Sequence, residues 1–142
     1  MTILSHKSLL TLIILSILSI AALADGNPKV TVEGSPSVDF GRYPAKNSKE
    51  AVFKIANRGG TPLKIVRIRK TCSCIEASCE KKQLEPEESA ELRAVIAANS
   101  IRGPYSKTIY VETNDPEKRF LCLTVSGEAA TVENAAPAGP PE

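Results

Sequence analysis

The stretch RFLCLTVSG, residues 119–127, alternates between two sets of side chains. One set is apolar and consists of Leu121, Leu123 and Val125. The other set is mixed and consists of Phe120, Cys122 and Thr124. Because successive side chains of a β-strand point to opposite faces, a period of two predicts a strand that packs with one face and leaves the other face largely in water.

The same period recurs in other stretches after residue 25. Each predicts a strand whose packed face is apolar, namely Ala51, Phe53 and Ile55 in EAVFKIAN (residues 50–57), Val66 and Ile68 in PLKIVRIRK (residues 62–70), Ala90, Leu92, Ala94 and Ile96 in SAELRAVIAA (residues 89–98), and Ile109 and Val111 in YSKTIYVETN (residues 105–114). Two shorter runs, KVTVEG (residues 29–34) and SVDFG (residues 37–41), precede them. These runs predict a chain built from short strands.

Turn-forming residues separate the runs in NRGGTP (residues 57–62), EPEES (residues 85–89), NSIRGP (residues 99–104) and TNDPE (residues 113–117). The turns recur at intervals of about 8–12 residues, which is the spacing typical of a β-sandwich. The sequence therefore predicts an all-β fold, an immunoglobulin-like β-sandwich of about seven strands.

Two of these turns contain residues with special backbone roles. In NRGGTP, Asn57 and the glycines are expected to take positive φ at a tight strand connection. In TNDPE, Asn114 and Asp115 are expected to hydrogen-bond their own backbone. A carboxylate next to an amide in a loop also suits a bound cation, and turn-making is the interpretation that we favour.

One stretch also has a composition that suits a helix. In PEESAELRAVIAAN (residues 86–99), Ala90, Ala94 and Ala97 would form a helical stripe. The alternation of Leu92, Ala94 and Ile96 and the all-β surroundings favour a strand instead.

The first 24 residues have the features of a secretory signal peptide. Lys7 precedes the apolar run LLTLIILSILSIAALA (residues 9–24), which ends in a small-x-small cleavage pattern. The run is shorter than the roughly 20 apolar residues that a membrane span needs, so cleavage is favoured over an uncleaved anchor. We expect a domain at residues 25–130, a disordered tail rich in Ala and Pro at residues 131–142, and a periplasmic or secreted product without a stable membrane anchor.

The composition that remains after cleavage excludes several kinds of chemistry. Removal of residues 1–24 takes Lys7 from the 18 basic residues and leaves 17 against 16 acidic ones, a net charge of +1. This balance favours neither nucleic acid nor an acidic membrane as a partner. The removed segment also holds the only histidine, so the mature chain lacks Ser-His-Asp and Cys-His catalytic units and histidine metal ligands.

Five motifs occur in an order that resembles a known family: VDFG (residues 38–41), NRGGTPL (residues 57–63), TCSC (residues 71–74), TNDP (residues 113–116) and LTVSG (residues 123–127). The chain is similar here to the bacterial secreted domain of unknown function fifteen-seventy-three and, more widely, to ASPM/Hydin-type immunoglobulin-like sandwiches. Members usually read Cys-Gly-Cys where this chain has Cys72-Ser73-Cys74. The resemblance implies a sandwich of seven or eight strands and supplies no activity.

The candidate site is the cysteine cluster in KTCSCIEASC (residues 70–79), which holds Cys72, Cys74 and Cys79, together with the distant Cys122. Outside the cytoplasm, four cysteines usually form disulfides, and four allow three pairings. A Cys72–Cys74 bridge closes a very small ring, which we expect to be strained and easily reduced. The two other pairings join Cys72 to Cys79 and Cys74 to Cys122, or Cys72 to Cys122 and Cys74 to Cys79. Either would close a loop of roughly 45 residues and add about 3–4 kcal/mol of stability.

The family pattern implies a further arrangement, in which the Cys72–Cys74 pair has its own role and only Cys79–Cys122 is a staple.

Two functional uses of Cys72 and Cys74 are alternatives to structural disulfides. The pair can present two sulfurs to a soft metal such as Cu(I), with Lys70, Lys81 and Lys82 nearby favouring thiolates. Alternatively, the pair can exchange disulfides as a redox site. A structural zinc site of four thiolates competes poorly with disulfide formation in an oxidising compartment.

Two charged clusters are assigned no site. The basic run Arg67, Arg69 and Lys70 is interpreted as the solvent-exposed face of an outer strand and not as an anion-binding site. The carboxylates of Glu85, Glu87, Glu88 and Glu91 lack the spacing of a glycosidase pair. The sequence thus predicts a non-enzymatic, exported binding or structural module of the cell envelope, without a cofactor and stapled by disulfides. Its partner would be an unidentified envelope protein, with an exposed sheet edge as the docking surface.

Overall fold

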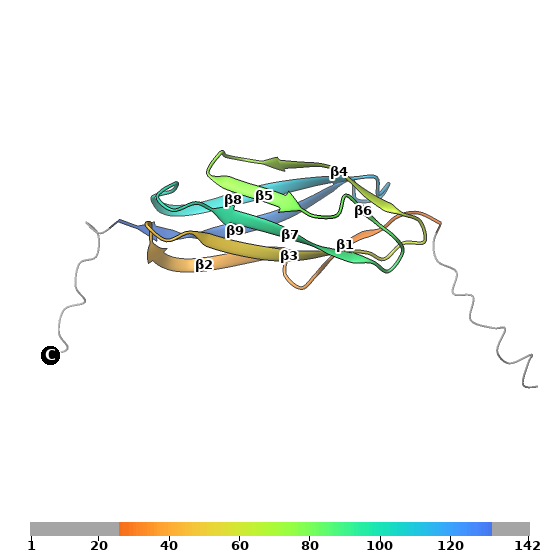
Figure 1. Cartoon of the computed structure of the whole chain (residues 1–142), viewed down its shortest axis with the longest axis horizontal. Coiled ribbons are helices and arrows are strands. Elements are labelled where there is room, and N and C mark those ends of the chain that lie inside the picture. The colour runs from red at the N-terminus through yellow and green to blue at the C-terminus, as the bar shows by residue number, and fades with distance from the viewer. Residues whose placement is uncertain (1–25, 132–142) are drawn as a thin grey trace, which may run out of the picture.

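The computed structural model describes residues 26–131, which form two β-sheets packed face to face (Figure 1). The predicted signal peptide and residues 132–142 of the predicted tail lie outside the described residues. Within the described residues the secondary structure consists of strands, turns and bends, so the predicted all-β sandwich is confirmed. Among residues 26–131, no helix has the length and hydropathy needed to cross a bilayer.

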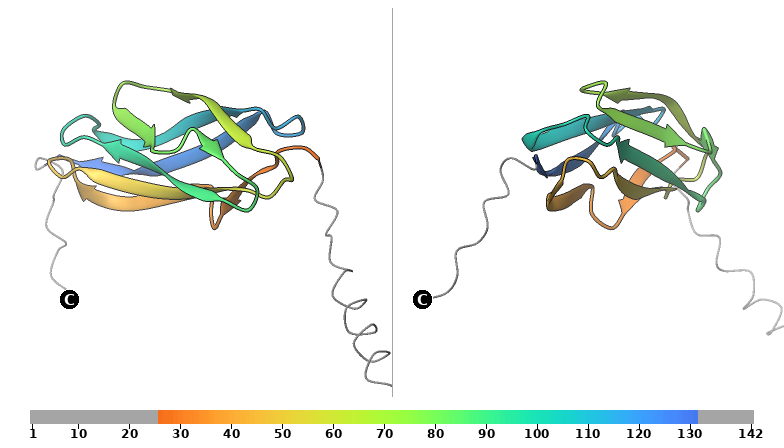
Figure 2. Two further views of the ribbon diagram at one scale, coloured as in Figure 1. Left: turned by 45° about the vertical axis from the view of Figure 1, so that its right-hand side comes forward. Right: turned by 60° about the vertical axis from the view of Figure 1, so that its left-hand side comes forward.

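The strands are β1 (Val30–Glu33), β2 (Ser37–Pro44), β3 (Lys49–Asn57), β4 (Leu63–Lys70), β5 (Ile75–Cys79), β6 (Gln83–Leu84), β7 (Ser89–Ile96), β8 (Gly103–Thr113) and β9 (Phe120–Ala130). One sheet has the order β1-β3-β7-β5 and the other β2-β9-β8-β4-β6. All pairings are antiparallel except the parallel pair β2–β9. Figure 2 shows the two layers from two further directions.

The described part holds nine strands instead of about seven, because β5 and β6 were not predicted. Strand β5 lies inside the cysteine cluster, for which the sequence pattern predicted no strand. Strand β6 has only two residues, which is too short for a period to be recognised. Both extra strands lie at an edge of their sheet, where β5 pairs with the predicted strand β7 and β6 pairs with the predicted strand β4.

The core sits between the sheets and is formed by the faces that the period of two predicted. Leu121, Leu123 and Val125 of β9 are buried, and so are the corresponding residues of β3, β7 and β8: Ala51, Phe53, Ile55, Ala90, Leu92, Ala94, Ile96, Ile109 and Val111. The stretch with helical composition is strand β7, which pairs with β3 on one side and β5 on the other. Tertiary pairing has therefore prevailed over the local helix propensity.

The predicted packed face of residues 62–70 is wrong in one half of the strand. Leu63 and Ile65 of β4 are buried, whereas Val66 is 61% exposed. The register with β8 shifts between Ile65 and Arg67, so an extra residue interrupts the alternation there. Beyond this bulge Ile68 packs against the core as predicted, and Arg67 and Arg69 are exposed.

One end of the sandwich is closed by the fully buried side chain of Asn57, at the end of β3. Its Oδ1 accepts hydrogen bonds from the backbone N–H groups of Lys29 (3.2 Å) and Gly59 (3.0 Å). Its Nδ2 donates to the carbonyls of Thr61 (2.8 Å) and Leu84 (3.0 Å). One side chain thus joins three segments that are far apart in the chain.

The expected positive φ angles in NRGGTP are not observed. Among the described residues, positive φ occurs at Gly34, Gly41, Gly103, Glu87 and Asn99, and not at Asn57 or the two glycines that follow. Glycine is required at position 59 for a different reason, because neighbouring backbone atoms leave no room for a side chain. A Cβ atom at Gly59 would lie 2.5 Å from the backbone N of Lys29 and closer still to the carbonyl oxygen of Asn27.

At the same end, TNDP forms a turn that is tied to two other segments. Asp115 is buried, and its carboxylate accepts hydrogen bonds from the backbone N–H groups of Glu117 (2.8 Å), Lys118 (3.1 Å) and Val30 (2.8 Å). Asn114 accepts from the N–H of Lys64 (2.6 Å). These contacts match the turn-making interpretation and occupy the carboxylate that a cation would need.

Candidate functional site

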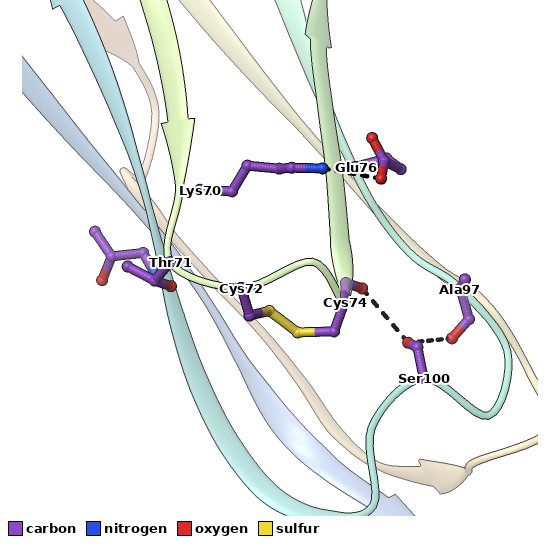
Figure 3. Close-up of a disulfide and its surroundings, with 8 residues drawn as sticks. Lys70, Thr71, Cys72, Cys74, Glu76, Ala97 and Ser100 are labelled. Atoms are coloured by element: carbon purple, nitrogen blue, oxygen red, sulfur yellow. Dashed lines mark hydrogen bonds and ion pairs between the residues drawn. A yellow bond between two sulfur atoms is a disulfide. The ribbon is translucent and has the colours of Figure 1, made fainter.

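Cys72 and Cys74 lie in the short connection between β4 and β5, where the chain passes from one sheet to the other (Figure 3). The two cysteines form a disulfide with each other. Their Cα atoms are 5.3 Å apart, which is within the ordinary range for a disulfide. The structure therefore contradicts the two pairings that the sequence analysis retained, and it forms the bridge that was expected to be strained.

Cys79 and Cys122 are free thiols and lie on different sheets. Cys79 ends β5 and is buried, and its Sγ donates a hydrogen bond to the carbonyl of Lys81 (3.2 Å). Burial raises the pKa of the Cys79 thiol. Cys122 is exposed on β9. The Cys79–Cys122 staple that the family resemblance suggested is therefore wrong, and the four cysteines do not form one cluster.

The turn that carries the bridge is held from three sides. The N–H of Thr71 donates to the carbonyl of Thr108 (3.3 Å), and the N–H of Thr108 donates to the Thr71 hydroxyl (3.3 Å). The ammonium of Lys70 pairs with the carboxylate of Glu76 (2.8 Å), from β4 across to β5 (Figure 3). The hydroxyl of Ser100 donates to the carbonyl of Cys74 (3.4 Å).

As a cross-link, the Cys72–Cys74 bridge adds little to the stability of the fold. It encloses a single residue between Cys72 and Cys74. The chain-entropy model credits a ring of that size with about 1.6 kcal/mol, compared with about 4 kcal/mol for a loop of about 45 residues. The strands on either side of the turn are already consecutive in the chain. The bridge therefore constrains a turn and does not link distant elements.

In the disulfide form both sulfurs of the proposed soft-metal pair are bonded to each other, so Cu(I) could bind only after reduction. Within the part of the chain that the structure describes, no three His, Cys, Asp or Glu side chains converge as a metal site would require. The acidic residues around β7 make surface ion pairs instead: Glu87 with Arg58, Glu88 with Lys81 and Glu91 with Arg93.

A second candidate surface is the outer face of the five-stranded sheet, which the sequence analysis did not identify. Tyr110 of β8 and Phe120 of β9 are 39% and 47% exposed there. Tyr110 lies directly opposite Cys122, and Phe120 lies opposite Glu112. Val66 is exposed at the β4 bulge beside them. We call this set, Val66, Tyr110, Phe120 and Cys122, the aromatic face.

Arginines surround the aromatic face. The guanidinium of Arg119 lies 5.6 Å from the centroid of the Phe120 ring and also pairs with the carboxylate of Glu112 (2.9 Å). Arg69 pairs with the same carboxylate from β4 (3.5 Å). Glu112 is buried in this network, and the hydrogen bond from Arg119 is the main cause that lowers the pKa of its carboxyl. The basic residues of β4 are thus not only exposed to solvent, because Arg69 takes part in an ion-pair network at the aromatic face.

The lowered pKa of Glu112 predicts a contribution to acid stability. The ionised carboxylate stabilises the fold fully above the pKa that it has in the unfolded chain, near 4.3. The contribution is lost as the pH falls through the lower folded pKa. We therefore expect the loss of stability between about pH 5 and pH 3 to be smaller in Glu112→Gln than in the wild type, as measured by urea unfolding across this range. Parallel curves for the two proteins would contradict this expectation.

A shallow polar depression of about 360 Å³ opens near the β2–β9 pair. It is lined by Asp39, Gly41, Arg42, Tyr105, Ser126, Gly127 and Glu128. Arg42 and Glu128 approach to 3.7 Å across it, and the Tyr105 hydroxyl lies 2.9 Å from that of Tyr43. Burial raises the pKa of Tyr105. Opposite charges lie side by side at this depression, so it does not select for a ligand of one charge.

The fold defines the class of protein first: two sheets of four and five strands make an immunoglobulin-like sandwich. The profile of the family described as "Protein of unknown function (DUF1573)" matches residues 31–129. The chain belongs to this family. The resemblance inferred from the five motifs between residues 38 and 127 is thereby confirmed. No curated protein matches the sequence.

Solved structures with the same fold have low sequence identity to this chain. A protein of unknown function from Porphyromonas gingivalis W83 is 20% identical with a TM-score of 0.64, and the match covers 78% of this chain and 51% of that chain. This chain thus spans about half the length of that protein. The ASH/PapD-like domain 7 of human CEP192 is 15% identical with a TM-score of 0.54, covering 91% and 96%. The VesB protease of Vibrio cholerae is 11% identical with a TM-score of 0.58, covering 72% and 32%. These likenesses concern the fold alone.

Proposed function

We propose that the chain is an exported, non-enzymatic immunoglobulin-like module of the cell envelope that binds another protein through the aromatic face. The fold and the family are compatible with many activities, so the proposal depends on the site. The features at residues 1–24 support export. After cleavage there, the chain would contain no histidine for acid–base or nucleophilic catalysis, which favours binding over chemistry on a substrate.

The observation that carries the proposal is the clustering of exposed apolar side chains. Four large hydrophobic residues are exposed in the described part of the chain, and Val66, Tyr110 and Phe120 belong to one face. The fourth, Val52, lies on β3 in the other sheet. Tyrosine, phenylalanine and arginine are enriched in protein interfaces, whereas isolated apolar residues on a surface need no explanation. The aromatic face with its arginines has this composition.

The charges around the aromatic face indicate what kind of partner fits. Arg67, Arg69 and Arg119 are exposed, and the single carboxylate among them, that of Glu112, is buried. The face therefore presents a net positive rim around an apolar centre. Electrostatic complementarity favours a protein surface with acidic side chains around an apolar centre.

We favour the face over the sheet edges, which the sequence analysis expected as the docking surface. Strand β1 has four residues, and its Val30 N–H is already bonded to Asp115. Strand β6 has two residues, and β2 is interrupted by a bulge near Gly41. Short and irregular edges are poor templates for strand addition. The edge of β5 is regular but only five residues long.

The test is capture of partners from envelope extract with the purified protein, followed by affinity measurement with the captured partner. Capture is carried out with and without a reducing agent, so that a mixed disulfide through Cys122 cannot imitate binding. Tyr110→Ser and Phe120→Ser are compared with the matched control Val52→Ser, which removes an apolar side chain of similar exposure from the opposite sheet. We expect each aromatic substitution to weaken binding at least about tenfold and the control to have no effect.

Two results would overturn the proposal. One is that no partner is retained at low salt. The other is that Val52→Ser weakens binding as much as Phe120→Ser, since the contact would then not be made by the aromatic face. A partner without an acidic surface, with affinity independent of salt, would contradict the charge argument.

A further inference from the structure

We propose that the Cys72–Cys74 bridge is a thiol–disulfide exchange site, which accepts two electrons and two protons from a dithiol. This activity is independent of binding at the aromatic face. Four features of the bridge support this activity: it is partly exposed, it contributes little as a cross-link, its turn is held by other contacts, and the remaining thiols lie away from it.

Accessibility comes from the position of the turn at one end of the sandwich. Thr71 and Ser73 are exposed, and Cys72 and Cys74 are intermediate in burial. The attacking group in disulfide exchange is a thiolate that must approach a sulfur directly. The side chains of Cys72 and Cys74 pack against the core and remain partly exposed in the turn, so a thiolate would reach the bridge from the solvent side of the turn.

The turn has contacts that do not depend on the bridge. The two hydrogen bonds between Thr71 and Thr108 fix the end of β4, and the Lys70–Glu76 ion pair spans the turn. The hydroxyl of Ser100 donates its single proton mainly to the carbonyl of Ala97 (2.6 Å) and makes a longer contact with that of Cys74 (3.4 Å) (Figure 3). None of these contacts involves a sulfur atom, so we expect the fold to persist when the bridge opens. A site that cycles between two redox states requires this.

The remaining thiols do not compete for the bridge. Cys79 lies at the far end of β5 from the turn, and its thiol is buried and hydrogen-bonded to the Lys81 carbonyl. Cys122 lies on the outer face of the other sheet. Internal reshuffling would require a free thiolate close to a bridge sulfur. After reduction, Cys72 and Cys74 therefore remain two free thiols and do not form a new disulfide with Cys79 or Cys122.

The chemistry balances without a further group. A thiolate of the external dithiol attacks the sulfur of Cys72 or Cys74, the bridge breaks, and a mixed disulfide forms while the displaced thiolate takes up a proton. The second thiol of the external dithiol, once deprotonated, attacks its own sulfur in the mixed disulfide. This step releases an oxidised external disulfide and leaves Cys72 and Cys74 as two thiols. Reoxidation is the same sequence in reverse, with an external disulfide as the oxidant.

The experiment titrates the Cys79→Ser/Cys122→Ser variant, in which only the bridge remains, against mixtures of reduced and oxidised glutathione. Thiols are trapped by alkylation and counted by intact mass, and circular dichroism follows the fold. We expect reversible conversion between bridge and dithiol with an unchanged β spectrum. We also expect dithiothreitol to reduce the bridge in the folded protein within tenfold of its rate in guanidinium chloride. Cys72→Ser and Cys74→Ser should each abolish oxidation of a dithiol peptide.

Three results would overturn the proposal. The bridge could stay intact in excess reduced glutathione, its reduction could unfold the domain, or the folded protein could be reduced more than a hundredfold more slowly than the unfolded chain. Each would show that the bridge is structural. Because the titration uses small thiols and no envelope extract, it does not depend on whether the aromatic face binds a partner.

Discussion

Substitution of Asn57 by alanine should lower the free energy of unfolding by about 3–5 kcal/mol. The Asn57 side chain is fully buried and makes hydrogen bonds with four backbone groups: two N–H groups, of Lys29 and Gly59, and two carbonyls, of Thr61 and Leu84. Alanine removes the partner of all four at once. A buried polar group without a partner costs about 1–3 kcal/mol, and relaxation with entry of water recovers part of the total.

The measurement is urea unfolding followed by circular dichroism. Asn47→Ala is the matched control, because Asn47 is exposed in a turn and should change stability by no more than about 0.5 kcal/mol. Asn57→Asp is informative as well. It keeps the oxygen that accepts from Lys29 and Gly59 but removes both donors, and it places a charge in a buried position, so we expect it also to be destabilising. A loss below about 1 kcal/mol in Asn57→Ala would show that the network is not needed to close this end of the sandwich.

The period of two was sufficient to predict the fold because a half-buried strand must place every second side chain in the core. This held in β3, β7, β8 and β9, whose alternation continues across the packed region. It failed at Val66, because a bulge inserts one residue and shifts every later side chain to the other face. Whether a bulge occurs depends on the partner strand, and the local sequence does not contain this information.

The aromatic face was missed for a related reason. Phe120 and Cys122 were correctly placed on the outer side of their strand. Their neighbours on that side, Tyr110 and Glu112, come from another strand and are defined by register. A cross-strand patch is a property of pairing, so it cannot be recognised from one strand at a time. The signal that was present in the sequence was an exposed phenylalanine opposite a packed leucine face.

The cysteines show the limit of reasoning from loop length. Long loops gain more from closure, so linking the cluster to Cys122 was favoured on entropy. Geometry decided otherwise, because Cys79 and Cys122 lie on different sheets and only Cys72 and Cys74 share a turn. The small ring does form, with its Cα atoms 5.3 Å apart, and its expected strain stays a prediction. The spacing along the chain showed that a Cys72–Cys74 bridge is one of the possible pairings. Which pairing forms depends on the backbone conformation of the turn, which the spacing does not give.

Substitution of Gly59 by alanine is expected to destabilise the fold by at least about 3 kcal/mol, although it adds only one methyl group. The new Cβ would overlap the backbone around Asn27 and Lys29, and backbone atoms cannot move aside as the end of a long side chain can. The segment must stay close because the N–H of Arg58 donates to the carbonyl of Lys29 (2.8 Å) and that of Gly60 to the carbonyl of Asn27 (3.1 Å). Relief of the overlap would therefore break the hydrogen bonds that hold the start of β1.

Gly26→Ala is the matched control, because a Cβ at Gly26 has no neighbour within 4 Å and Gly26 is not among the residues with positive φ. The midpoint of thermal unfolding should change little in Gly26→Ala and fall by well over about 10 °C in Gly59→Ala, at about 4–8 °C per kcal/mol for a domain of about 100 residues. Because Gly59 does not have positive φ, the loss must come from the overlap and not from backbone strain.

Deletion of residues 26–28 in the Gly59→Ala protein removes the carbonyl of Asn27, so it should remove part of the overlap. The double variant should then lose less than the sum of the two single losses. Additive losses would show that the methyl group does not act through this contact.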